Sequence, residues 1–309
     1  KMAICLSGDF DPDQMIATID KYFGGLKPNP DLPKLDLPKE TPITAPVVRE
    51  ILGPDAESVA LAWRFPGAAD KDVETLQVVS QILYNGQAGL IDLDLTQQQK
   101  TLSAYCYPMT MSDYSAFMMQ GRPKQGQTLD EVKDLLLGEL KKLREGDFDE
   151  KMLEANINNF KLYQLQQLEN NDARADMFVE SFVNGSDWAD EVTALDRMSK
   201  LTKDDIVAFA NKYLKDDNYA VIYKKQGKDP NEKKMSKPEI TPIVMNRDTV
   251  STFLKEIQAS VVTPIEPVFL DYSKDLTQLK AKSEIPVLYK QNTTNDIFQL
   301  IYLFDMGNN

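Results

Sequence analysis

Apolar residues occupy every second position between residues 59 and 65, with smaller or polar residues between them. The apolar positions are Val59, Leu61, Trp63 and Phe65. A period of two predicts a strand with one face in a core. The apolar period becomes three and four residues between 71 and 84, which predicts a helix with one buried face. Asp70 is expected to cap the start of this helix, and Gly86 to end it in a left-handed conformation.

A turn of small residues follows this helix, and it consists of Asn85, Gly86, Gln87, Ala88 and Gly89. After the turn we expect a second short helix, then a strand over residues 103–108 that pairs with a strand over residues 114–121. Upstream, strands are expected over residues 47–52 and 59–65. They flank Gly53-Pro54-Asp55, which predicts a hairpin between them.

Capping residues mark the helices of the second half of the chain. Thr128 and Glu131 have the spacing of a capping box, and apolar residues at helical spacing continue from there to Gly146. Further helices are expected over residues 150–169, from there to Val183, and over residues 203–214, and a closing strand over residues 218–224. This order of elements predicts an α+β fold with helices packed on one face of an antiparallel sheet.

The first residues predict a strand over residues 2–6 followed by a helix. Asp11, which precedes a proline, is expected to cap that helix. Asp9, Asp11 and Asp13 also match the first three ligand positions of a calcium loop. Such a loop needs glycine at its sixth position, where Gln14 stands, so capping is the preferred interpretation.

Prolines and a repeated pattern divide the chain into parts. Proline recurs between residues 27 and 46, which disfavours both a helix and a central strand. Residues 287–307 repeat the strand, turn, strand and glycine layout of residues 47–67, and such a repeat indicates a duplicated domain. The expected parts are a remnant of a preceding catalytic-type domain (1–26), a proline-rich tether (27–43), a complete non-catalytic domain (44–226), a linker with a short helix over residues 249–259 (227–284) and the opening hairpin of a next domain (285–309).

Composition removes several classes of function. Of the 309 residues 42% are hydrophobic, which is enough for at least one full core. The net charge of -13 offers no general attraction for phosphate backbones, so we expect no nucleic-acid partner. No apolar run reaches about 18 residues, so we expect no membrane span. Cys5 and Cys106 lie in apolar runs, where a free buried thiol is usual. Histidine is absent, which excludes any histidine-dependent zinc site or catalytic triad.

Four stretches of the chain carry a resemblance when they are taken together: MAICLSGDFDPDQMIATIDKYFG, LYNGQAGLIDLDL, TLSAYCYP and EGDFDEKMLE. They resemble the insulinase-like (pitrilysin) family of zinc metallopeptidases. In that family four similar α+β domains form two halves that close around an unfolded peptide, and the first domain carries the zinc motif HxxEH. The resemblance implies that this chain is the second, inactive domain with flanking pieces. A start at Lys1 without an initiator methionine agrees with an excised segment.

The resemblance places the family's catalytic helix at residues 71–84. This helix contains no histidine, so the zinc ligands cannot be carried over. We therefore expect no catalytic residue, no metal ligand and no cofactor within this segment, and we expect zinc in the missing first domain of the parent. Glu74 is interpreted as a solvated acid in the first turn, favoured by the helix dipole, rather than as a catalytic group.

Substrate-binding residues are implied only at the glycine turn. By resemblance, Asn85, Gly86, Gln87, Ala88 and Gly89 would hold the N-terminal part of a peptide beside a strand edge, where main-chain hydrogen bonds supply affinity. A helix end and turn without a ligand is the plainer alternative. A set of aromatic residues would either line a peptide groove or, as we favour, pack in a core or cover a domain face. The set is Tyr105, Tyr107, Tyr114 and Phe117.

The sequence therefore predicts the non-catalytic domain of a zinc-dependent endopeptidase that digests unfolded peptides. This segment would supply chamber wall, substrate-holding surface and hinge, and its partners would be unfolded peptide and the remaining domains of the parent chain. The alternative is a scaffold or assembly subunit of the same fold without peptidase activity. An independent peptide-binding module is a third possibility, which the repeated hairpin disfavours. Family habit favours a periplasmic or cell-envelope parent.

Overall fold

The computed structural model of the protein describes residues 2–33, 38–230, 236–242, 249–264, 266–305 and 307. The chain divides into two compact units, Lys1–Asn231 and Glu232–Asn309, and each is considered by itself. The first unit contains a five-stranded sheet with its helices, and the second contains a short helix and a two-stranded sheet.

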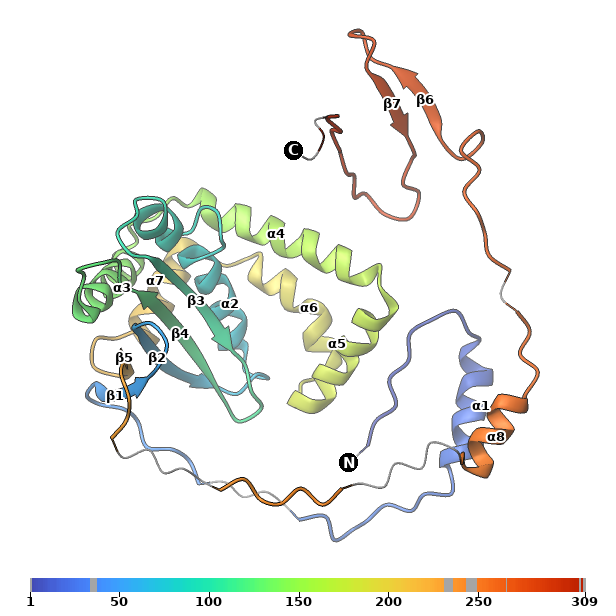
Figure 1. Ribbon diagram of the computed structural model, residues 1–309, viewed down its shortest axis with the longest axis horizontal. Helices are drawn as coiled ribbons and strands as arrows, with labels where there is room; N and C mark the ends of the chain where they lie inside the picture. Colours follow the sequence, from blue (N-terminus) through green and yellow to red (C-terminus); the bar gives the residue numbers. More distant parts are fainter. Residues whose placement is uncertain are drawn as a thin grey trace. The chain divides into compact units, whose positions relative to one another are not determined.

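The sheet of the first unit has the strand order β1-β5-β2-β4-β3 (Figure 1). Its strands are β1 (Val47–Gly53), β2 (Ser58–Pro66), β3 (Ser103–Met109), β4 (Tyr114–Arg122) and β5 (Tyr219–Gln226). Neighbouring strands are antiparallel except for β1 and β5, which are parallel. A mostly antiparallel sheet with helices packed against it confirms the predicted α+β fold class.

The predicted hairpin between the first two strands is wrong, because β5 lies between them. Val59 of β2 pairs with Tyr223 of β5, and Val221 of β5 pairs with Val48 of β1. Buried and half-buried positions alternate along the whole of β2, whereas no residue of β1 is buried. The Gly53-Pro54-Asp55 sequence indicates a turn, but it does not determine which strands pair. β2 has an apolar face to bury, and a central position in the sheet, between β5 and β4, buries it.

Seven α-helices are described in the first unit: α1 (Pro12–Phe23), α2 (Lys71–Leu83), α3 (Leu129–Glu145), α4 (Lys151–Leu168), α5 (Asn171–Asn184), α6 (Trp188–Met198) and α7 (Lys203–Tyr213). Of these, α6 was not predicted, although Asp187 caps its start. Both α2 and α3 pack on the sheet (Figure 1). Leu61 of β2, Leu76 of α2 and Leu136 of α3 are fully buried in the core between them. Burying one leucine side chain contributes about 1.5–3 kcal/mol, so this shared apolar layer holds the helices on the sheet.

The capping residues act as predicted. Thr128 Oγ1 accepts the N–H of Glu131, and the Glu131 carboxylate accepts the N–H of Thr128, which confirms the capping box. Asp11 accepts the N–H of Gln14 at the start of α1, which is the role preferred over calcium binding. The strand expected over residues 2–6 is wrong: they form no strand and are mostly exposed. A short apolar run forms a strand only where another strand pairs with it.

The second unit contains α8 (Thr252–Ala259), β6 (Thr277–Lys280) and β7 (Pro286–Tyr289). β6 and β7 pair antiparallel, with Gln278 opposite Leu288. The hairpin predicted within residues 287–307 is therefore wrong: its first strand pairs upstream, and residues 290–305 form no strand. Every residue of β6 and β7 is exposed, and without a buried face the apolar pattern does not specify which segments pair.

Candidate functional site at the glycine turn

The turn after α2 depends on two glycines for different reasons. α2 ends at Leu83, and Tyr84 is already extended. Gly86 has a φ of 80°, which a residue with a side chain adopts only at a cost. At Gly89 a Cβ atom would lie 2.6 Å from the carbonyl oxygen of Leu83. The left-handed conformation of Gly86 was predicted, but this glycine lies beyond the end of the helix.

The carboxylate of Asp92 holds the turn from outside. Its Oδ2 accepts hydrogen bonds of 3.0 Å from the backbone N–H groups of Asn85, Gly86 and Gly89. Asp92 is 4% exposed and begins a π-helix, Asp92–Thr96, where a short helix was expected. Hydrogen bonds from N–H groups to a carboxylate are roughly twice as strong as neutral ones. The buried charge and the shape of the turn therefore stabilise each other.

The side chain of Asn85 holds the turn from within. Its Oδ1 accepts the N–H groups of Gln87 and Ala88 at 3.0 and 2.9 Å. Its Nδ2 donates to Oδ1 of Asn156 on α4 at 3.3 Å. With the bonds to Asp92, every backbone N–H group from Asn85 to Gly89 is bonded to a side chain. The turn therefore has no free main-chain donor for a ligand.

Sequence reasoning missed Asp92 and Asn156. Asp92 stands in the apolar run GLIDLDL, where an acid at a position expected to be buried is the available signal. No local signal marks Asn156, which is 71 residues from Asn85 and reaches it because α4 packs against α2. Asn156 is 2% exposed, and its Nδ2 has no hydrogen-bond partner among the described residues.

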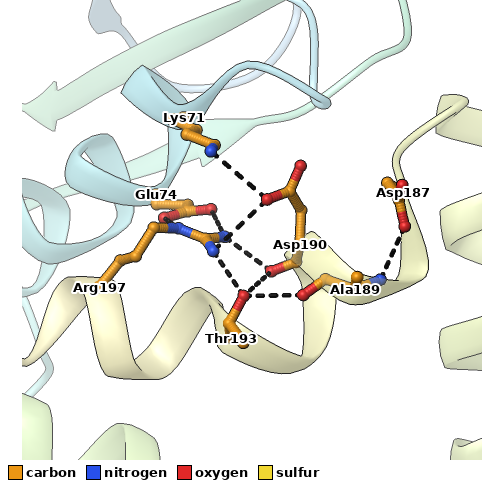
Figure 2. Close-up of polar contacts among 7 residues, drawn as sticks. All are labelled: Lys71, Glu74, Asp187, Ala189, Asp190, Thr193 and Arg197. Carbon is orange, nitrogen blue, oxygen red and sulfur yellow. Dashed lines mark hydrogen bonds and ion pairs between the residues drawn. The ribbon is translucent and has the colours of Figure 1, made fainter.

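Helix α2, which the resemblance places at the family's catalytic helix, does not carry a set of residues that fits zinc. Glu74 on α2 is bound at two points by Arg197 on α6, with Nε–Oε2 and Nη2–Oε1 distances of 2.9 and 2.5 Å (Figure 2). The guanidinium also donates to Thr193 Oγ1 and to the carbonyl oxygen of Asp190, each at 2.6 Å. Zinc requires histidine, cysteine or available carboxylate ligands. Within the described parts of the chain, no cluster of three such side chains could hold a metal ion. Glu74 is thus a partner of Arg197 rather than the solvated acid expected.

Two further carboxylates near the π-helix share one lysine. Lys142 on α3 donates to Asp94 at 2.8 Å and to Glu139 at 3.1 Å. The side chain of Glu139 is 5% exposed, and burial raises its pKa although Lys142 opposes the rise. This cluster ties α3 to the segment after the turn. The charged groups of this cluster are paired with one another, so we interpret it as a structural contact.

The aromatic residues selected from the sequence lie in different environments. Phe117 is fully buried, as the preferred interpretation expected. The hydroxyl of Tyr114 accepts the N–H of Glu40, and the Arg64 guanidinium lies 5.4 Å from the centre of its ring. Tyr114 therefore fastens the segment before β1 to the sheet.

Tyr105 and Tyr107 lie on the side of β3 opposite the helices. Cys106 between them faces α2, and its Sγ contacts the carbonyl oxygen of Ser80 at 3.6 Å. The two tyrosine rings are stacked with centroids 6.1 Å apart, and Tyr107 is 37% exposed. Tyr84, the residue before the turn, lies 6.3 Å from Tyr105. An aromatic row therefore connects β3, the end strand of the sheet, with the glycine turn.

Residues 1–160 match the sequence profile of the family described as Peptidase M16 inactive domain. Among curated proteins, "Zinc protease PqqE" of Helicobacter pylori is 24% identical over 228 residues, which are 72% of this chain and 51% of that protein. The chain therefore spans about half the length of the curated relative it matches.

Solved structures share the fold. A protease from Helicobacter pylori superimposes with a TM-score of 0.65 at 22% identity, over 71% of this chain and 53% of that chain. The periplasmic protease PqqL from Escherichia coli gives a TM-score of 0.56 at 13% identity, over 94% of this chain and 34% of that chain. Because the profile covers more than half of the 309 residues, the chain belongs to the insulinase-like (pitrilysin) M16 peptidase family and carries its inactive domain.

Proposed function

We propose that this chain is the non-catalytic second domain of a zinc-dependent endopeptidase and forms part of a chamber wall that holds unfolded peptides. The observation that carries this proposal concerns Glu74 on α2, where the family's catalytic group would stand by resemblance: its carboxylate is bound by Arg197 of α6. Membership of the inactive-domain family and the likeness to a zinc protease support a parent that binds zinc in another domain. Catalysis would then belong to residues outside this chain.

The free edge of β3 beside the glycine turn is the proposed peptide-holding surface. β3 ends the sheet, so one of its edges has no strand partner within the described residues. An extended peptide adds to such an edge through main-chain hydrogen bonds. Its alternate side chains would lie beside Tyr105 and Tyr107. The N–H groups of the turn are already bonded, so the turn contributes shape at the end of the edge rather than hydrogen-bond donors.

The test compares this chain with its longer parent protein. Bound zinc is measured by mass spectrometry, and cleavage of an unfolded, internally quenched fluorescent peptide is followed with and without a chelator. We expect no stoichiometric zinc and no cleavage for this chain, and chelator-sensitive cleavage for the parent. Chelator-sensitive hydrolysis by this chain alone would contradict the proposal.

A parent without zinc and without cleavage would instead indicate a scaffold or assembly subunit of the same fold. For the location of the parent, we propose the periplasm or the cell envelope, supported by the structural likeness to a protease described as periplasmic. None of the helices in the described ranges is long and apolar enough to cross a membrane. Fractionation of cells that express the parent tests the location.

A further inference from the structure

The carboxylate of Asp92 comes from outside the glycine turn, yet it determines much of the turn's shape. The backbone N–H groups of Asn85, Gly86 and Gly89 all donate to one oxygen, Oδ2. Across the described ranges of the chain, no lysine or arginine forms an ion pair with Asp92. The three N–H dipoles therefore compensate its buried charge, and a buried carboxylate requires such partners.

The exposed part of the turn has little other support. Residues 86–88 are exposed, and a Cβ atom at Gly86 would meet no atom within 4 Å. Hydrogen bonds to Asp92 and to the Asn85 side chain hold these residues in place, with a further bond from Gln97 Nε2 to the carbonyl oxygen of Gln87 at 2.9 Å. A segment that is held by hydrogen bonds without packing becomes mobile when its acceptor is removed.

We infer that Asp92 is a positioning residue of the peptide-holding surface: its carboxylate fixes the turn in the conformation that leaves the end of the β3 edge open to a peptide. This inference rests on the proposed function. Without the carboxylate, a peptide would have to order the turn as it binds, and that ordering lowers affinity. Loss of Asp92 should therefore weaken peptide binding by about tenfold without any loss of a direct contact.

The test measures binding of a fluorescein-labelled, unstructured peptide of about ten residues to the full chain by fluorescence anisotropy, since such a peptide suits strand addition. Asp92→Asn retains an acceptor oxygen without the charge, and Asp92→Ala retains neither. We expect a loss of several-fold for Asp92→Asn and of about tenfold for Asp92→Ala. Amide hydrogen exchange at Gly86 and Gly89 should accelerate in the same order.

Two controls separate positioning from loss of stability. Asp94→Asn removes the neighbouring acid of the same π-helix, which contacts Lys142 and not the turn, and should leave the affinity unchanged. Ile206 is a buried residue of α7, and Ile206→Val and Ile206→Ala should lower the Tm without changing a residue of the turn. If Asp92 acts by positioning, its variants lose more affinity than Ile206 variants of equal Tm. Equal losses at equal Tm would overturn the inference.

A substitution at a fourth position distinguishes failure of the inference from failure of the proposed function. Ala88→Gln adds bulk at an exposed position whose N–H group stays bonded to Asn85, so it obstructs a peptide without loosening the turn. If Ala88→Gln weakens binding and Asp92→Ala does not, the inference is overturned and the proposed surface stands. If Ala88→Gln binds like the wild type, or the wild type binds no peptide, the proposed surface is overturned and the inference with it.

Discussion

Arg197 on α6 binds both carboxylate oxygens of Glu74 on α2, a residue 123 positions earlier in the chain. The two side chains are 28% and 21% exposed, so water screens the pair only in part. Of the two residues, Glu74 stands on α2, the helix that the resemblance places at the catalytic helix of the family. A carboxylate bound in this way is a contact between two helices, which agrees with an inactive domain.

Removing the arginine should destabilise the domain. Arg197→Ala leaves the half-buried Glu74 carboxylate without its partner, so we expect the free energy of unfolding to fall by about 1–3 kcal/mol. Urea denaturation measures the change. Lys71→Ala is the control. The Lys71 Nζ atom lies 3.4 Å from Asp190 Oδ1, but the lysine side chain is 64% exposed. Its removal should therefore change the free energy of unfolding by no more than about 0.5 kcal/mol. Equal effects of the two substitutions would contradict a structural role for the pair.

Substituting alanine for glycine should change the stability of the domain in opposite directions at two positions, according to the space around the added Cβ atom. Gly89→Ala would force a Cβ atom against the carbonyl of Leu83, and we expect a loss of about 1–3 kcal/mol. Gly138→Ala, inside α3 with no atom within 4 Å of the added Cβ, should gain about 0.5–1 kcal/mol because alanine favours a helix. Thermal and urea unfolding of both variants measure whether the two changes in unfolding free energy have opposite signs. A stabilising Gly89→Ala would show that the turn does not require this close approach.

Glu139 should make the domain less stable as pH rises. Burial raises its pKa above the ordinary value of 4.5, although Lys142 opposes the rise. Between the unfolded and the raised folded pKa, the folded state binds more protons than the unfolded state. The contribution of Glu139 is therefore fully present below pH 4.5 and is lost as pH rises through the folded pKa.

Glu139→Gln removes this titration. As pH rises, the free energy of unfolding of the wild type should fall relative to that of the variant. The fall should be about 1.4 kcal/mol for each pH unit by which the folded pKa exceeds the unfolded pKa. Denaturant unfolding at a series of pH values measures it. Glu145→Gln, on the same helix with its side chain 60% exposed, is the control for removing one carboxylate from α3. If the wild type instead became more stable relative to the variant as pH rises, the raised pKa of Glu139 would be contradicted.

The two cysteines should differ in reactivity. Both are free thiols, and Cys106 is 4% exposed with a pKa raised by burial, whereas Cys5 is half-buried. The thiolate is the reactive form, so Ellman's reagent should modify Cys5 in the native protein and Cys106 only after unfolding in urea. Cys5→Ser should abolish the fast native reaction. Rapid modification of the Cys5→Ser protein without denaturant would show that the strand packing around Cys106 opens readily.

The elements that the sequence predicted correctly are those whose signals are local. Alternation along β2 and the Thr128 capping box depend on residues within a few positions of each other, and both appear as predicted. The α+β class follows from the order of such elements. The missing histidines were visible at once, because the absence of a ligand type requires no structure.

Contacts between distant residues were decided only by the tertiary structure. β5 is inserted between β1 and β2, Arg197 is bound to Glu74, and Asn156 reaches Asn85 across α4 and α2. Each of these follows from which faces become buried against each other when the whole chain packs. Apolar residues with a period of two or 3.6 residues indicate that a segment has a face to bury. The period does not indicate which other segment covers that face.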